Sequence, residues 1–238
     1  HDQTCNAINF ATVDPSQGPV EAYNNVIYHT GIGPRPTGGE SNYACIYNAD
    51  TTNKGTPGSG VVQLYNNTFY DCAPHSISAG RDNGVVNDAG YNTGLTINLR
   101  NNASQQLVGE SYIGTDGGSG LNQITGNNNL WFGLGNGPSQ TTANINADPQ
   151  FTSLVTPDFH IPTGSPAKDA GVTIASRIAD YDGVPVPQGA GTDVGAYEFG
   201  TTGPSANPDL TMTYTSNAEP WYPGDTSKTF TCTVSNSG

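Results

Sequence analysis

The stretch Val20-Glu-Ala-Tyr-Asn24-Asn25-Val-Ile-Tyr28 carries the feature that decides the fold: alternating apolar residues end in an Asn-Asn pair, and a short apolar segment follows. The same order returns in Val62–Tyr70, in Ile97–Asn102 and in Ile124–Trp131. The pairs begin at residues 24, 66, 101 and 127, so successive units are 42, 35 and 26 residues apart. Strand-like units repeated at such spacing predict an all-β solenoid, a right-handed parallel β-helix.

A second strand pattern precedes each Asn-Asn unit and is centred on an isoleucine. These isoleucines are Ile8, Ile46, Ile77 and Ile113, which are 38, 31 and 36 residues apart. One coil is therefore predicted to hold a strand around the isoleucine, a loop, a strand ending in Asn-Asn, and a third strand. The spacing varies because loops between stacked strands tolerate insertions.

Asparagine suits the turn of such a coil for two physical reasons. It tolerates the left-handed backbone of a sharp turn. Its amide can also hydrogen-bond the equivalent amide in the next coil, about 4.8 Å away, which builds a ladder. The predicted ladder residues are Asn24, Asn25, Asn66, Asn67, Asn101, Asn102, Asn127 and Asn128.

The composition changes after residue 150: residues 1–150 contain 22 asparagines, whereas residues 151–200 contain none. The later segment carries a distinct series of motifs, namely Asp148-Pro-Gln-Phe151, Asp158-Phe-His160, Gly164-Ser-Pro-Ala-Lys-Asp-Ala-Gly171, Asp180-Tyr-Asp-Gly183 and Asp193-Val-Gly-Ala-Tyr-Glu198. This order resembles the C-terminal end of secreted bacterial right-handed β-helix proteins grouped with the choice-of-anchor Q domain. The resemblance implies coils over residues 1–147 and a last irregular coil and cap over residues 148–199.

Residues 200–208 are expected to form a linker, because they are rich in Gly, Pro, Ser and Thr. Strands are predicted at 209–214 and 228–234, with a Pro223-Gly-Asp225 turn between them. The segment 209–238 is similar to the opening of a bacterial cell-adhesion-related immunoglobulin-like domain. The resemblance implies the first strands of a β-sandwich that needs about seven.

The charge balance limits the partners of this chain. Seven Lys and Arg stand against 20 Asp and Glu, which gives a formal net charge of −13. Nucleic acid is excluded, because phosphate binding needs clustered basic residues. No stretch is long and apolar enough for a membrane span. The sequence begins within a strand pattern, so we expect a piece of a longer extracellular protein, secreted or displayed on the cell surface.

The four cysteines, Cys5, Cys45, Cys72 and Cys232, are too scattered for a zinc site. Cys45 and Cys72 lie near strands of successive coils and are the candidate disulfide pair. The alternative is that they are buried, unpaired apolar residues.

Many β-helix proteins act on polysaccharides, and one loop cluster is a candidate for such a site. Loops 48–60 and 79–92 would lie side by side on adjacent coils, and they carry Asp50, Lys54, Arg81, Asp82 and Asp88. These charges form either one wall of a ligand groove or solvated loops. Outward tyrosines could form a sugar-stacking platform or could simply pack.

The remaining candidates concern metals and histidines. Asp180-Tyr-Asp182-Gly183 partly matches a calcium loop, so Ca²⁺ is the one candidate cofactor, although the closing acidic positions are missing. His29 and His75 could approach each other across a turn, and His160 is expected to pack within the cap.

We therefore expect an extracellular module with a structural, adhesive or surface-assembly role. The alternatives are a polysaccharide lyase, or another carbohydrate-active β-helix enzyme, and a non-catalytic carbohydrate-binding module. The open edge of the first coil must be covered, and we expect upstream coils or neighbouring subunits to cover it. Pairing at that edge would allow filament assembly.

Overall fold

The computed structural model describes residues 6–10, 13–30, 44–48, 58–72, 84–88, 94–107, 111–115 and 123–200, together with the backbone of 210–216 and 230–236. No α-helix occurs in these ranges, and one short 3₁₀ turn, Pro15–Gln17, precedes the second strand. Each coil contains three strands, and each strand pairs in parallel with the strand three places later in the chain, such as β1 with β4.

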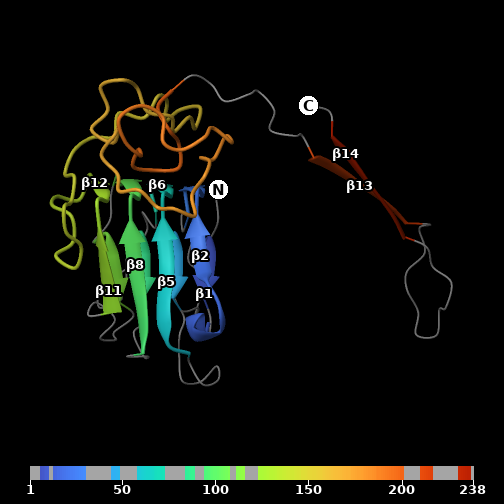
Figure 1. Cartoon of the computed structure of the whole chain (residues 1–238), viewed down its shortest axis with the longest axis horizontal. Helices are drawn as coiled ribbons and strands as arrows, with labels where there is room; N and C mark the ends of the chain where they lie inside the picture. The colour runs from blue at the N-terminus through green and yellow to red at the C-terminus, as the bar shows by residue number, and fades with distance from the viewer. Residues whose placement is uncertain are drawn as a thin grey trace, which may run out of the picture.

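Three four-stranded parallel sheets form the walls of the solenoid (Figure 1). The first sheet contains β1 (Ile8–Phe10), β4 (Ile46–Asn48), β7 (Val86–Asp88) and β10 (Ile113–Thr115). The second contains β2 (Val20–Tyr23), β5 (Gly60–Tyr65), β8 (Leu95–Arg100) and β11 (Ile124–Asn127). The third contains β3 (Val26–Tyr28), β6 (Thr68–Tyr70), β9 (Ala103–Gln105) and β12 (Leu130–Phe132). The predicted four-coil parallel β-helix is confirmed.

One predicted strand position is wrong. In the third coil, Val86 pairs with both Ile46 and Ile113. The sequence pattern had placed Ile77 there, and Ile77 lies outside the described residues. Ile77 stands between two serines and Val86 follows Val85, and both are β-branched apolar residues within a polar stretch of sequence, so the apolar pattern alone does not separate them. The backbone register does.

Alternation along the strands fills the interior of the coils. In β8, Leu95, Ile97 and Leu99 are buried while the residues between them are partly exposed. Their neighbours in β5, Val62 and Leu64, are also buried. Each coil therefore places its apolar side chains directly above those of the next, and this stacked apolar column forms the main core.

A short fifth turn covers the outer edge of the fourth coil. Thr142 and Ile145 form parallel bridges with Asn127 and Leu130. The Trp131 N–H donates to the Ile145 carbonyl (2.8 Å), and the Ile145 N–H donates to the Asn129 carbonyl (2.9 Å). The bonds that cover this end thus come from residues preceding Asp148, where the expected cap begins.

Residues 148–199, which we call the side segment, lie along the flank of the solenoid. In Figure 1 they lie over the ends of strands β2, β5 and β8, beside the stack and not beyond its last coil. Phe159 and Tyr197 pack there on Tyr70 of β6. The two last strands, β13 (Leu210–Ser216) and β14 (Phe230–Asn236), form an antiparallel pair. That pair agrees with the two strands predicted in this region, while the immunoglobulin-like sandwich stays a prediction.

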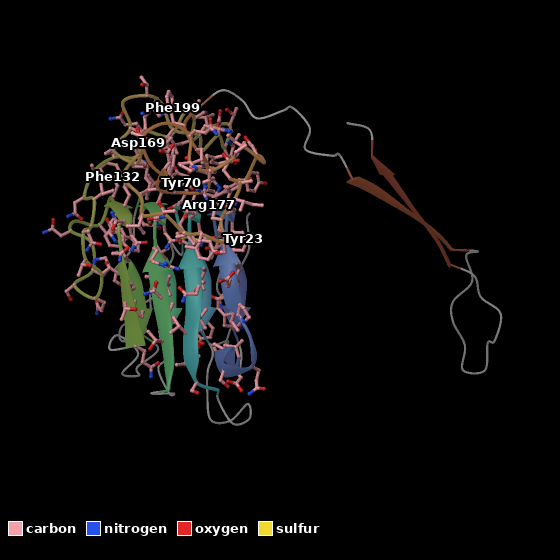
Figure 2. All side chains as sticks on the ribbon, in the orientation of Figure 1. Tyr23, Tyr70, Phe132, Asp169, Arg177 and Phe199 are labelled. Atoms are coloured by element: carbon pink, nitrogen blue, oxygen red, sulfur yellow. A yellow bond between two sulfur atoms is a disulfide. The ribbon has the colours of Figure 1, made fainter. Side chains whose placement is uncertain are left out.

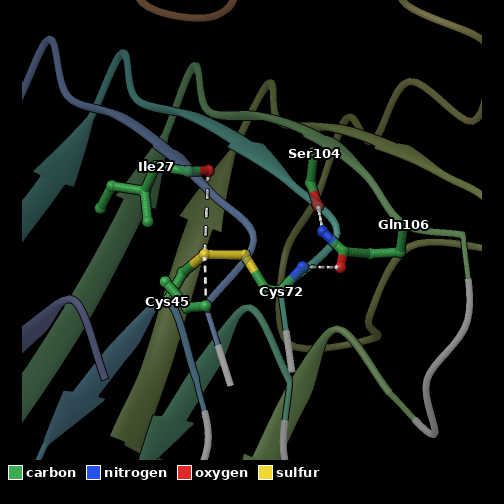
Figure 3. The surroundings of a disulfide bond; sticks show 6 residues. Ile27, Cys45, Cys72, Ser104 and Gln106 are labelled. Carbon is green, nitrogen blue, oxygen red and sulfur yellow. Dashed lines mark hydrogen bonds between the residues drawn. A yellow bond between two sulfur atoms is a disulfide. The ribbon is translucent and has the colours of Figure 1, made fainter. Parts of the chain in front are cut away.

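The candidate disulfide is formed. Cys45, immediately before β4, is bonded to Cys72, just after β6, and their Cα atoms are 5.4 Å apart (Figure 3). The bond links the first sheet to the third. The Cys72 N–H also donates to Gln106 Oε1 in the next coil (2.7 Å). Such a bond is typical of proteins that mature in an oxidising compartment.

Removing this disulfide in a Cys45→Ala/Cys72→Ala variant is expected to lower the free energy of unfolding by about 3 kcal/mol. The bond closes a loop between residues that are 27 positions apart, which restricts the unfolded chain. Urea denaturation of the double variant measures the loss. The unsubstituted chain, reduced with dithiothreitol, serves as the matched control. An unchanged midpoint in both would show that the bond does not constrain the unfolded chain.

Candidate functional site: the asparagine turns and the side segment

The first residue of each Asn-Asn turn has a left-handed backbone. The φ angles of Asn24, Asn66, Asn101 and Asn128 lie between 49° and 53°. This conformation costs asparagine less than other residues with a Cβ atom, because its short amide can bond locally. A fifth position, Ala143, repeats the angle in the short turn over the fourth coil (φ 48°).

The second residue of each turn builds the ladder. Asn25 donates through Nδ2 to Asn67 Oδ1, Asn67 to Asn102 Oδ1, and Asn102 to Asn129 Oδ1, each over 2.9 Å. Each acceptor oxygen also takes the backbone N–H of the preceding Asn, at 3.0–3.1 Å. The second Nδ2 hydrogen of Asn67 reaches the carbonyl of Ala22, and that of Asn102 reaches the carbonyl of Leu64. Asn67, Asn102 and Asn129 are completely buried, so these bonds satisfy groups that water cannot reach.

The fourth pair of the predicted ladder is shifted by one residue. Asn127 ends β11 and pairs with Arg100, while the turn itself is formed by Asn128 and Asn129. The run of three asparagines offered two registers. Strand β11 fixes the choice, because its pairing with β8 places Asn127 before the turn.

The first asparagine of each turn forms hydrogen bonds with the side segment. Asn24 Nδ2 donates to the Ala179 carbonyl (2.7 Å), and Asn128 Nδ2 donates to the Ala170 carbonyl (3.0 Å). Between them, Asn101 exchanges two bonds with the backbone of Val172. Asn66 Nδ2 donates to the carbonyls of Asp193 and Gly195. The second asparagines of the turns thus form one row of amides that joins the coils to each other. The first asparagines form a neighbouring row that joins all four coils to the side segment.

A buried ion pair lies where the side segment meets the first turn. Arg177 Nη1 contacts Glu198 Oε1 at 2.6 Å, and both side chains are completely buried. Arg177 Nε also donates to Asn24 Oδ1 (2.8 Å). Figure 2 labels Arg177 near the ends of the solenoid strands. Glu198 further accepts the N–H groups of Asp193 and Gln188. Because both charges are paired and hydrogen-bonded, the interior tolerates the ion pair. Neither residue was identified as a candidate from the sequence.

Three aspartates of the side segment bind backbone N–H groups. Asp169 accepts from Ala190 and Gly191, and Asp193 accepts from Asp169 and Phe199. Asp180, the first residue of the candidate calcium loop, accepts from Asp182, Val184 and Glu198. Its two carboxylate oxygens therefore hold a turn together. Within the described ranges, no group of three or more His, Cys, Asp or Glu residues is arranged to hold a metal ion.

His160 bridges two parts of the side segment. Its Nδ1 lies 2.5 Å from Asp158 Oδ1, its Nε2 lies 2.7 Å from Asp182 Oδ2, and its ring lies 4.1 Å from that of Tyr197. Partial burial alone would lower the pKa of His160, but the hydrogen bonds to both carboxylates outweigh it, and the pKa is raised. The expected packing role is thus joined by a charged bridge.

We expect the domain to be most stable at mildly acidic pH. Burial raises the pKa of Asp193 to about 6 against the bonds from Asp169 and Phe199. A raised native pKa stabilises the fold below the unfolded value, and that stability is lost as the pH rises through the native one. Asp193 therefore contributes a decrease between about pH 4 and 6, and His160 a further decrease above about pH 6.5. The pKa of Asp169 is lowered by its bonds to Lys168 and Gly191, so its contribution is lost only in stronger acid.

Thermal unfolding from pH 4 to 8 tests this expectation. The midpoint should be highest near pH 4 and about 2–4 °C lower at pH 8. His160→Gln should flatten the curve above pH 6.5 and leave the decrease below pH 6 unchanged. A midpoint that rises from pH 5 to pH 8 would contradict the assignment.

Most of the predicted loop cluster lies outside the described residues, namely Asp50, Lys54, Arg81 and Asp82, and so does His75. Asp88 is the exception: it lies on β7, is fully buried, and accepts a bond from Asn48 Nδ2 (2.8 Å). His29 contacts Tyr28 and Tyr70 at the end of the third sheet. Asp88 is therefore a buried strand residue, and its predicted place in the loop cluster, either on a groove wall or in a solvated loop, is wrong.

The outward tyrosines of the second sheet stack on each other. The rings of Tyr23 and Tyr65 are 4.8 Å apart with an interplanar angle of 4°, and Arg100 lies over the Tyr65 ring. Tyr65 is completely buried, while Tyr23 is 44% exposed. Each Tyr65 face is thus covered, and the predicted sugar platform is reduced to the outer face of Tyr23.

Comparison with protein-family models gives no match, and comparison with curated proteins gives none either. The described part of the chain contains no helix long and apolar enough to cross a membrane. The geometry therefore defines the class, a parallel β-solenoid with an asparagine ladder, and the two family resemblances stay predictions.

Proposed function

We propose that this chain is a rigid structural module of an extracellular, surface-assembled protein. The observation that carries the proposal is the double row of turn asparagines, which joins all four coils to each other and to one side segment. Sliding or peeling any coil would break bonds in both rows together. That property suits a part that bears load or sets a fixed distance.

Two further features support an extracellular setting. The Cys45–Cys72 bond favours an oxidising compartment. The low content of basic residues and the net charge of −13 keep such a surface soluble and disfavour binding to nucleic acid. The resemblance of residues 209–238 to an adhesion-related domain favours a role in adhesion.

Single-molecule force spectroscopy on the full chain tests the load-bearing role. The solenoid should unfold in one cooperative high-force event, because the ladder and the side segment couple its coils. The Asn102→Ala variant should lower that force, whereas Asn98→Ala, on the outer face of β8, should leave it unchanged. Gradual low-force unravelling, unaffected by Asn102→Ala, would reject the proposal.

A further inference from the structure

Two loops of the side segment meet at His160 but are anchored separately. The first loop, residues 152–160, is a hairpin closed by the pairing of Ser153 with Asp158. The buried ring of Phe159 fixes this hairpin to the third sheet, where its centroid lies 5.6 Å from that of Tyr70. The hairpin would therefore stay on the solenoid even without its contact to the second loop.

The second loop, residues 180–183, is a tight turn held to the end of the side segment. Asp180 Oδ2 accepts the Glu198 N–H over 2.9 Å. Among the described residues, the hairpin and this turn share a single hydrogen bond or ion pair, between His160 Nε2 and Asp182 Oδ2 (2.7 Å). One side chain thus links two loops that the rest of the structure holds apart from each other.

Both ring nitrogens of His160 face a carboxylate. Nδ1 lies 2.5 Å from Asp158 Oδ1, while Nε2 faces Asp182. A carboxylate only accepts hydrogen bonds, so each contact needs a proton on the ring nitrogen, and only the imidazolium carries two. The neutral ring has one N–H and must leave one carboxylate facing a nitrogen lone pair. The two contacts together therefore require the charged form of His160.

The contact with Asp182 is the one that the neutral ring loses. Asp158 is two residues away from His160 and also accepts its backbone N–H (3.2 Å), so it stays beside the ring wherever the turn lies. The carboxylate of Asp182 forms no other hydrogen bond with a described residue. Loss of one proton is therefore expected to separate the hairpin from the turn.

Three further titratable side chains lie around this contact. The ring of Tyr197 lies 4.1 Å from that of His160, and Tyr181 packs against the edge of Tyr197. Burial raises the pKa of Tyr197, so its phenol stays neutral where histidine titrates. The Asp180 carboxylate is already occupied by backbone N–H groups. None of these groups supplies a second proton to the ring of His160.

The contact titrates near neutral pH. Partial burial alone would lower the pKa of His160, but its hydrogen bonds to Asp158 and Asp182 raise it. Its titration is therefore expected above the ordinary value for histidine, about 6.5.

We propose that His160 is a pH-sensitive latch, which ties the hairpin to the turn as an imidazolium and releases the turn as a neutral ring. Release uncovers the face of Tyr197 on which His160 lies, while Phe159 keeps the hairpin on the solenoid. The latch is a local device of the side segment and does not depend on the load-bearing role proposed above.

NMR on the isotope-labelled full chain from pH 5 to 8 tests the latch. The nuclear Overhauser effect between the rings of His160 and Tyr197 should fall by about fivefold or more as His160 titrates, because the released state becomes the major one. The nitrogen shifts of the neutral ring should show the proton on Nδ1, since Asp158 holds it there.

Asp182→Asn separates the latch from a general effect of charge. The amide can accept from the imidazolium and can also donate to the lone pair of a neutral Nε2, so the ring contact should persist from pH 5 to 8. Asp148→Asn is the matched control. It removes the same charge from an exposed aspartate of the side segment, which accepts the Gln150 N–H and has no hydrogen bond to His160. In that variant the contact should be lost as in the unsubstituted chain.

Three results would overturn the proposal. The first is a ring contact that is unchanged from pH 5 to 8 in the unsubstituted chain. The second is a neutral ring that keeps its proton on Nε2, because Asp182 would then remain bound. The third is loss of the contact in Asp182→Asn at the same pH as in the unsubstituted chain. If Asp182→Asn does not fold, the first two measurements still decide, because they need no substitution.

Discussion

Replacing Asn102 with alanine is expected to lower the free energy of unfolding by about 3–5 kcal/mol. The side chain makes four hydrogen bonds in a fully buried turn, to Asn67, Leu64 and Asn129. The substitution leaves the Asn67 N–H without its acceptor and the Leu64 carbonyl without this donor. Each buried polar group without a partner costs about 1–3 kcal/mol. Chemical denaturation with circular dichroism measures the change.

Asn98→Ala is the matched control, because Asn98 lies in the same strand unit but bonds only Thr125 Oγ1 on the outer face. Its effect should stay within about 0.5 kcal/mol. Equal, small losses in both variants would mean that the ladder does not hold the coils together.

Replacing Arg177 with methionine is expected to cost about 3–5 kcal/mol, because the Glu198 carboxylate would remain charged and buried without its partner. The bond from Arg177 Nε to Asn24 Oδ1 would be lost as well, which loosens the side segment at the first coil. Thermal and urea unfolding report the loss.

A double-mutant cycle separates the ion pair from these other contacts. Arg177→Met/Glu198→Gln should be more stable than Arg177→Met alone, because the amide removes the unpaired charge. If the loss in free energy of unfolding of the double variant equals the sum of the losses in the two single variants, the charges are not coupled. Packing of the arginine then explains its effect.

The repeated coils could be predicted because each one carries its pattern within a short stretch of sequence. Apolar alternation predicted the strands β2, β5 and β8, and the Asn-Asn pairs predicted the turns that follow them. The periodicity could not choose between Ile77 and Val86 or between Asn127 and Asn129. Ile77 and Val86 are both β-branched apolar residues, and Asn127 and Asn129 belong to one run of asparagines. In both cases only the pairing of whole strands decides the register.

The role of the side segment could not be predicted from its own pattern. Its contacts with Asn24, Asn66, Asn101 and Asn128 involve mostly backbone carbonyls. Every residue type has such a carbonyl, so the sequence does not show which residues make these contacts. Arg177 offered one signal: it is one of only seven basic residues, and it lies in a segment with several carboxylates. A lone arginine in such surroundings is a candidate for a buried partner of Asp or Glu.

The most direct test of the ladder is hydrogen exchange of the asparagine side-chain amides, followed by NMR on the labelled full chain. The structure predicts that the Nδ2 hydrogens of Asn67, Asn102 and Asn129 exchange at least about a hundredfold more slowly than those of Asn98. Exchange of Asn67 and Asn102 at the rate of Asn98 would contradict the ladder and with it the rigid module.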